Sequence, residues 1–195
     1  LLEPGDSIEP LPDIDFNIRH GNTLVGYASA DETERAVMGA TQGNLFNDAW
    51  EDIRIRLIAV EREYNNFQIQ QVQLGGHITA QDKQALVDNL YELEETLKYH
   101  LAREYGVDPT KTKKYADWKA SHKPFHWFVD FYPLMAAGGF DVVIGNPPYV
   151  VFPSTDVPYA WPRDYYRCES SKNLYALVSE RSIELATDEG AIGLI

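Results

Sequence analysis

Four consecutive residues, Asn146-Pro147-Pro148-Tyr149, have the types and spacing that chemistry on an amino group requires. An exocyclic amine such as adenine N6 is a poor nucleophile, because its lone pair is delocalised into the ring. Two acceptors on the amine hydrogens can hold that lone pair out of conjugation, and the Asn146 side chain and the Pro147 carbonyl are two such acceptors. The two prolines fix φ at about −65° and stiffen the loop. Tyr149 offers a flat face on which a base can stack. These residues indicate amino-group methylation.

The residues before this loop place it at the edge of a sheet. Phe140 to Gly145 is a β-branched run bounded by glycine, which is typical of a buried core strand in a parallel sheet. Ligands of doubly wound sheets lie beyond the carboxyl ends of such strands, so we expect Asn146 at that edge. The alternative is a rigid turn without chemistry, since Asn and Pro are common in loops.

Composition excludes several classes of protein. A chain of 195 residues is long enough for the core of one domain with an accessory subdomain. No apolar run approaches the roughly 20 residues that span a bilayer, and no cleavable signal is recognisable, so we expect no membrane partner. The single cysteine, Cys168, excludes a disulfide framework and favours a cytoplasmic location. The 5 histidines lack metal-ligand spacing, and we predict no metal site.

The charge of the chain argues against extensive contact with nucleic acid. The formal net charge is −13, whereas contacts to phosphate depend on Lys and Arg. One basic segment, interleaved with Tyr115 and Trp118, could contact DNA or could be a solvated basic loop. Its candidate DNA-contacting residues are Lys111, Lys113, Lys114 and Lys119, with Lys123 beside them.

Hydrophobic periodicity predicts a large helical part. Residues 16–19 alternate as a short strand does, and a turn at residues 20–22 follows. Between residues 31 and 105, two apolar stripes at helical spacing predict two long helices. The glycine-containing residues 74–77 would join them into an antiparallel hairpin.

The second half of the chain returns to an alternation of helices and strands. We expect a buried helix at residues 125–135 and an amphipathic helix at 173–187, with strands at 142–144 and 191–195. The fold class is therefore α/β with a large helical insertion. We divide the chain into the start of a core (residues 1–30), an insertion that holds the hairpin and the basic loop (31–120), and the core with the Asn146 loop (121–195).

Two further groups admit both a functional and a structural interpretation. His126 could act as a base, but a packed aromatic helix is favoured, because N6 methylation needs a proton acceptor only after transfer. The long irregular segment after residue 150 is rich in aromatic residues. These could clamp DNA or an extruded base, or could simply pack, and they are Tyr159, Trp161, Tyr165 and Tyr166.

Three blocks of the chain resemble a known family, the Eco57I-like adenine-specific N6 DNA methyltransferases. Members are fused to restriction or phage-defence systems and include the methylase part of type IIG enzymes. The blocks are residues 11–26, residues 125–131 with 138–149, and residues 173–177 with Glu180 and Arg181. Together they span nearly the whole chain.

The resemblance implies a class I, Rossmann-like fold that uses S-adenosyl-L-methionine and acts on double-stranded DNA. Asn146 and Pro147 would bind the N6 amine. Tyr149, with Pro148, would contact an adenine flipped out of the duplex, at a cost of about a few kcal/mol. Asn22 would bind the adenine edge of the cofactor. Methyl transfer would be a direct in-line attack by N6, without a covalent enzyme intermediate.

The chain departs from the family pattern at the cofactor site. A glycine-rich loop that opens the first βα unit, and an acidic ribose ligand, are expected upstream of residue 1. We therefore expect the site for S-adenosyl-L-methionine to be incomplete in this chain and the fragment to be inactive alone. The remainder of the parent polypeptide would be its partner.

Two other functions remain open at this point. Methyltransferases that act on a protein glutamine or on an RNA base also use Asn-Pro-Pro-Tyr to hold a planar amide or amine, and the acidic charge favours them weakly. The helical insertion and residues 15–19 favour the DNA family. The second alternative is a non-catalytic fragment whose helical hairpin is an interaction surface.

Overall fold

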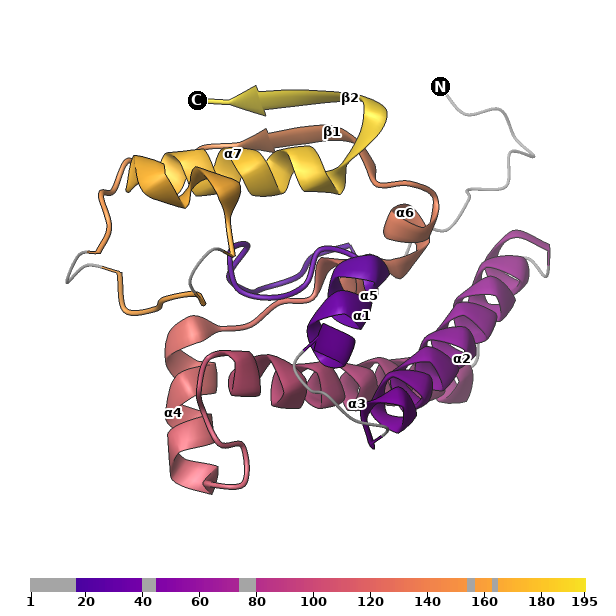
Figure 1. Ribbon diagram of the computed structural model, residues 1–195. Helices are drawn as coiled ribbons and strands as arrows, with labels where there is room; N and C mark the ends of the chain where they lie inside the picture. The colour runs from indigo at the N-terminus through magenta and orange to yellow at the C-terminus, as the bar shows by residue number, and fades with distance from the viewer. Residues whose placement is uncertain (1–16, 40–44, 74–79, 154–156, 163–164) are drawn as a thin grey trace, which may run out of the picture.

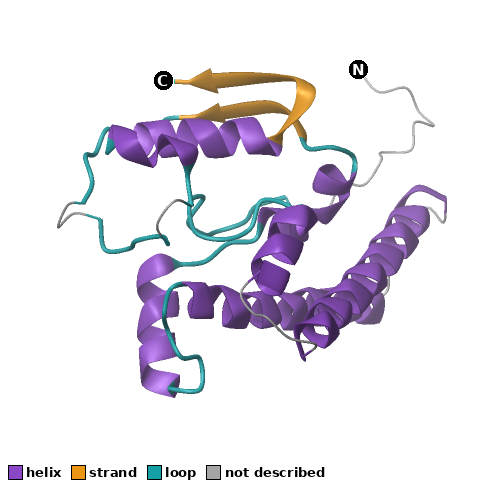
Figure 2. Cartoon of the chain, viewed as in Figure 1, coloured by secondary structure: helices purple, strands orange, loops and turns teal. Residues whose placement is uncertain are grey.

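The computed structural model describes residues 17–39, 45–73, 80–153, 157–162 and 165–195. Figure 1 shows a small sheet with one helix against it on one side of the molecule and the long helices on the other, and Figure 2 shows loops running between the two parts. The fold is thus mixed α/β, as predicted. The elements in chain order are α1 (Ala30–Gly39), α2 (Leu45–Gln73), α3 (Ala80–Glu104), α4 (Thr112–His122), α5 (Trp127–Asp130), α6 (Tyr132–Ala136), β1 (Phe140–Gly145), η2 (Arg167–Ser171), α7 (Leu174–Leu185) and β2 (Ala186–Leu194).

The sheet consists of two parallel strands in the part of the chain that the structure describes. β1 pairs with β2, for example Val143 with Ile192, and α7 connects the two strands. Both strands and the helix between them were predicted and are confirmed. A full Rossmann-like sheet stays a prediction, because the described residues contain this one pair of strands.

The expectation that β1 is buried on both faces is wrong for the described sheet. Val142 and Ile144 are 56% and 77% exposed, respectively, and both lie on the face opposite α7. The reason is that a parallel strand is covered on both faces only when helices pack on both sides. Here α7 covers one face, and no described segment covers the other.

The predicted helical hairpin is present. α2 and α3 run antiparallel, since Arg56 bonds Glu92 (2.9 Å) whereas Asn89, earlier in α3, bonds Glu63 (2.6 Å), later in α2. Burial of each large apolar side chain contributes about 1.5–3 kcal/mol, far more than these exposed polar pairs. The apolar stripes therefore hold the hairpin together, through Ile53, Leu57, Val60, Tyr64, Leu86, Leu90, Leu93, Leu97 and Leu101. The predicted connection at residues 74–77 lies outside the described residues.

The basic segment is a helix, α4, so its prediction as a loop is wrong. Trp118 is buried against the core of the hairpin, and Tyr105 meets it edge-on at 5.5 Å between ring centroids. Tyr115 and His122 lie on the same side of α4 and also contact the Trp118 ring. Lys113 and Lys114 thus lie on the outer face of an amphipathic helix, whose aromatic positions recur at helical spacing.

The short strand predicted at residues 16–19 is absent from the described part of that segment. Residues 17–19 form no strand, because no described segment pairs with their backbone, and Ile18 is 73% exposed, while residue 16 lies outside the described residues. The next residues run beside the segment that leads into α5. Phe125 N–H donates to the Val25 carbonyl (2.7 Å), and Trp127 N–H donates to the Tyr27 carbonyl (3.0 Å).

The helix predicted at residues 125–135 is divided into α5 and α6. Pro133 has no N–H and cannot continue the hydrogen bonding of α5, so the chain turns at Phe131 and starts again. Gly139 N–H then donates to the Leu134 carbonyl (3.0 Å) with a φ of 118°, which ends α6 directly before β1.

Candidate functional site

The Asn146 loop lies where the sequence predicts, at the carboxyl end of β1. The Gly145 carbonyl accepts the Ile195 N–H (3.1 Å), so the sheet pairing continues up to the residue before Asn146. Asn146 is exposed, and its carboxamide has no hydrogen-bond partner among the described residues. Pro147 is buried, whereas Pro148 is exposed and Tyr149 is 70% exposed. The loop is thus anchored at Pro147 and presents an amide and a ring to solvent.

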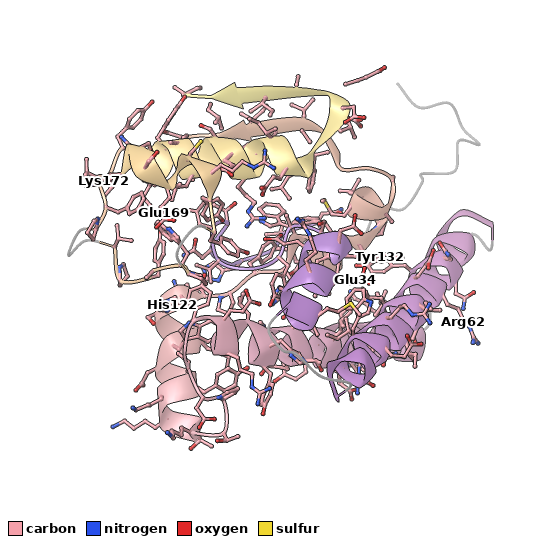
Figure 3. All side chains as sticks on the ribbon, in the orientation of Figure 1. Glu34, Arg62, His122, Tyr132, Glu169 and Lys172 are labelled. Atoms are coloured by element: carbon pink, nitrogen blue, oxygen red, sulfur yellow. The ribbon has the colours of Figure 1, made fainter. Side chains whose placement is uncertain are left out.

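Two backbone hydrogen bonds fix the chain on the far side of the loop. Leu174 N–H donates to the Val150 carbonyl (2.9 Å), and Phe152 N–H donates to the Lys172 carbonyl (3.0 Å). Lys172, which Figure 3 labels, lies directly before α7, and Leu174 is the first residue of that helix. The Asn146 loop is therefore held at one end by the sheet and at the other by α7.

The Tyr149 ring has one aromatic neighbour, Tyr175 of α7. Their ring centroids are 5.4 Å apart and the rings are 22° from parallel, which is a stacked arrangement. Sequence reasoning did not identify Tyr175, although its place two residues after Asn173 at a helix start could have suggested a position near the loop.

Asn22 is held in a tight turn. Its side-chain Oδ1 accepts the Leu24 N–H (3.1 Å), and its backbone N–H donates to the Lys123 carbonyl (2.8 Å). A carboxamide has two donor hydrogens and two acceptor lone pairs. The bond from Leu24 uses one acceptor lone pair, so the Asn22 carboxamide keeps both an acceptor and a donor for a further polar edge.

One apolar cluster brings the Asn22 turn close to the Asn146 loop. Leu24 packs with Leu174 and Leu177 of α7, and Val150 and Phe152 pack against the same cluster. The cluster gathers three segments that are far apart in the sequence. The structure thus joins the two predicted site regions through α7, although Asn22 and Asn146 make no direct hydrogen bond in the described chain.

Arg181 is the polar centre of this junction, and sequence reasoning assigned it no role. It is 1% exposed, and its Nη2 donates to the Gly26 carbonyl (3.1 Å) and to the Tyr166 hydroxyl (2.9 Å). Its Nη1 lies 3.4 Å from Glu32 and 3.1 Å from Glu184. The guanidinium therefore ties α7 to the residues that follow the Asn22 turn.

The aromatic residues of the irregular segment pack rather than face solvent. The Tyr166 hydroxyl donates to the Leu24 carbonyl (2.7 Å), and the Tyr165 hydroxyl donates to the Gly26 carbonyl (3.0 Å). Trp161 meets Phe152 edge-on, with centroids 4.7 Å apart. For these residues the structural interpretation is the one observed.

His126 is also structural. It is fully buried, and its Nδ1 accepts the Tyr27 N–H (3.3 Å). Burial lowers the pKa of His126 to about 3, with the positive charges of Lys98 and Arg181 acting in the same direction. A neutral, enclosed imidazole cannot reach a substrate, in agreement with the favoured interpretation.

Asp130 lies between α5 and the hairpin. Among the described carboxyl groups there, it is the one whose pKa departs strongly from its ordinary value. Burial and, to a smaller extent, the nearby Glu94 raise the pKa of Asp130 to about 8, although Arg19 (3.7 Å) and Lys98 act to lower it. The ordinary pKa of an Asp is about 3.9. Asp130 is therefore protonated in the folded chain over a pH range in which it is ionised when unfolded.

We expect the free energy of unfolding to fall as the pH rises through this range. Between about pH 4 and pH 8 the folded chain holds a proton that the unfolded chain has lost, so the slope is negative and at most about 1.4 kcal/mol per pH unit. Urea denaturation at several pH values across this range measures the slope. Asp130→Asn, which imitates the protonated acid, should flatten the curve, and the exposed Asp117→Asn should not. An equal slope in the wild type and Asp130→Asn would contradict the assignment.

The candidate DNA-contacting lysines differ in their availability. Lys119 is paired with Glu95 (2.7 Å) and lies over the Tyr115 ring, and Lys111 lies 3.7 Å from Asp108. Lys113 and Lys114 are exposed on α4 and pair with no described acid. The latter two are the stronger candidates for phosphate contact.

The described residues provide neither a metal site nor a membrane span. No group of three or more His, Cys, Asp or Glu side chains there is arranged to hold a metal ion. No helix among these residues is both long and apolar enough to cross a membrane.

Comparison with known proteins identifies the family. Residues 38–195 match the model of the Eco57I restriction-modification methylase family. A protein of Methanocaldococcus jannaschii, described as a type II restriction enzyme and methyltransferase, is 23% identical over 71% of this chain. The match covers 15% of that relative's length. No solved structure matches the chain. Since the family model covers most of its length, the chain belongs to the Eco57I restriction-modification methylases.

Proposed function

We propose that this chain is the catalytic segment of a DNA adenine-N6 methyltransferase from a restriction-modification or phage-defence system. The observation that carries the proposal is the exposed Asn146 carboxamide, without a described partner, at the carboxyl end of β1 and three residues from the open ring of Tyr149. The family membership supports methyl transfer, and the name of the M. jannaschii relative supports DNA as the substrate.

The Asn146 loop would activate the amine of the target base. Asn146 Oδ1 and the Pro147 carbonyl accept its two hydrogens, which keeps the lone pair out of conjugation and directed at the methyl donor. The anchored Pro147 matters here, because only acceptors held in place before the reaction stabilise the transition state without reorganisation. Tyr149, with Pro148, contacts the adenine after it leaves the duplex stack.

The methyl donor would be S-adenosyl-L-methionine, which supplies an electrophilic methyl group on a sulfonium. The spare donor and acceptor of Asn22 fit one edge of its adenine, which needs one of each. Asn22 would therefore hold that edge. We propose that the rest of the cofactor site is contributed by the remainder of the parent polypeptide, and that the fragment is inactive alone.

The segments of the chain divide between these tasks. Residues 1–30 and 121–195 would belong to a Rossmann-like core, which the bond from Arg181 to the Gly26 carbonyl supports by joining them. Residues 31–120 would be the inserted hairpin with α4, whose Lys113 and Lys114 would contact DNA phosphates, with smaller contributions from Lys111 and Lys119. We place the protein in the cytoplasm, where its double-stranded DNA substrate is accessible.

Asn146→Ala in the full-length protein tests the proposal. We expect kcat for methylation of DNA to fall by about 100-fold or more, because one of two acceptors that act in the transition state is lost. Transfer of labelled methyl groups from S-adenosyl-L-methionine measures it. The control Asn65→Ala removes an exposed amide from α2 and should leave kcat unchanged.

The molecule that receives the methyl group separates the DNA proposal from the RNA and protein alternatives. The same labelled assay is run with DNA, RNA and a release-factor-like protein. Label in protein alone would support the glutamine-methylating alternative, label in RNA alone would support the RNA-base alternative, and either would end the DNA proposal. Full activity of Asn146→Ala on DNA would show that Asn146 has no part in activation of the amine.

A further inference from the structure

The stacked pair Tyr149 and Tyr175 suggests a role for a residue outside the Asn146 loop. Tyr149 is 70% exposed, and within the described chain its ring has a single aromatic neighbour, Tyr175. We propose that Tyr175 is a positioning residue, which supports the Tyr149 ring from behind so that the extruded base, Tyr149 and Tyr175 form one continuous stack. This inference rests on the proposed function.

Tyr175 is held more firmly than Tyr149. It lies in the first turn of α7, and its N–H donates to Oδ1 of Asn173, the residue that caps the helix (3.0 Å). Asn173 is in turn paired with Val151, directly beyond the Asn146 loop. The helix start thus holds both the Tyr175 backbone and the segment that follows Tyr149, so hydrogen bonds fix the two backbones that carry the rings.

The exposure of Tyr149 leaves its second face for a base. Tyr175 covers one face of the ring, and a side chain that is 70% exposed has its other face in solvent. Without Tyr175, the Tyr149 ring would be free to change rotamer, and the base would have to order it on binding. A supporting ring therefore makes the stacking platform ready before the base arrives.

Tyr175 could instead occupy the place of the base. The direction in which removal of its ring changes DNA binding distinguishes this arrangement from the supporting one. If Tyr175 occupied the place of the base, the base would have to displace it, and removal of the Tyr175 ring would strengthen binding. If Tyr175 supports Tyr149, removal of its ring weakens binding. Two backbone bonds between residues 150–152 and 172–174 hold the backbones that carry both rings side by side, which favours the supporting role.

The test is a set of variants of the full-length protein in the DNA methylation assay. Tyr175→Met keeps a helix-forming side chain of similar volume but removes the flat face, and we expect KM for DNA to rise on the order of 3- to 10-fold, with a smaller change in kcat. Tyr175→Phe retains the ring and should restore the wild-type KM. Tyr91→Met, the same change at an exposed position on α3, should have no effect.

A double-mutant cycle shows whether Tyr175 acts through Tyr149. We expect Tyr149→Leu to raise KM, and Tyr175→Met to add nothing in that background, because the ring that it supports is gone. A general loss of folding would act in both backgrounds alike, so the cycle isolates the pair. Additive effects, an unchanged KM in Tyr175→Met, or a lower KM would each overturn the inference.

Asn146→Ala keeps this result separate from the proposed function. If Asn146→Ala abolishes methylation and Tyr175→Met behaves as the wild type, the inference about Tyr175 fails and the proposed function stands. If Asn146→Ala retains full methylation, the proposed function itself fails, whatever the effect of Tyr175→Met.

Discussion

Replacement of Arg181 by methionine is expected to lower the free energy of unfolding by about 3–5 kcal/mol, as for other buried ion pairs from which one partner is removed. Methionine preserves most of the volume, so the loss is polar. The Gly26 carbonyl loses its bond from the guanidinium, and Glu32, which is 24% exposed, is left without its cation. Tyr166 retains its bond to the Leu24 carbonyl and limits the damage.

Lysine should not rescue this position. A single ammonium cannot direct separate N–H groups to Gly26, Tyr166 and Glu32, as the planar guanidinium does. Urea denaturation of the wild type, Arg181→Met and Arg181→Lys measures the difference. The control is Arg54→Met on the exposed face of α2, where a surface pair contributes at most about 1 kcal/mol. Equal losses of unfolding free energy at positions 181 and 54 would show that burial of Arg181 does not increase its contribution to stability.

Gly26→Ala is expected to destabilise the chain by about 3–5 kcal/mol, from backbone strain and overpacking together. Gly26 has a φ of 135°, which side chains rarely adopt, and an added Cβ would lie 1.9 Å from the Phe125 carbonyl oxygen. That oxygen belongs to backbone that is paired with Val25, so it cannot move without loss of the pairing.

Gly106→Ala separates the two causes. Gly106 also has a positive φ, of 68°, but an added Cβ there meets nothing within 4 Å. Its cost should be the backbone term alone, about 1–2 kcal/mol. Thermal unfolding of both variants measures the difference. If Gly106→Ala were as costly as Gly26→Ala, the close approach of Phe125 to Gly26 would not be the cause.

The parts of the fold that the sequence predicts are those with local signals. The β-branched run of β1 and the apolar stripes of α2 and α3 each specify their element within a few residues of sequence, and all three are present. The position of Asn146 at the end of β1 follows from the same reasoning. α4 was missed because the five lysines within and directly beside it suggested a solvated loop, while its aromatic residues carried the helical periodicity.

Contacts between distant segments could not be predicted in this way. Arg181 is buried only because Glu32, Gly26 and Tyr166 meet it, and none of these is near it in the sequence. Tyr175 likewise has no local signal that it stacks on Tyr149. The exposure of Ile144 depends on how many helices cover the sheet, which no property of β1 itself reveals.

α7 holds Tyr175 at its first turn and Arg181 about six residues later, which corresponds to roughly 9 Å along the helix axis. The first turn is thus attached to the loop proposed to bind the base, and the middle of the helix to the residues that follow the turn proposed to bind the cofactor. A regular helix changes its length very little, so under this proposal it would act as a spacer of constant length between the nucleophile and the methyl donor. The entropy of aligning the two reactants would then be lost when the chain folds, and not again in each turnover.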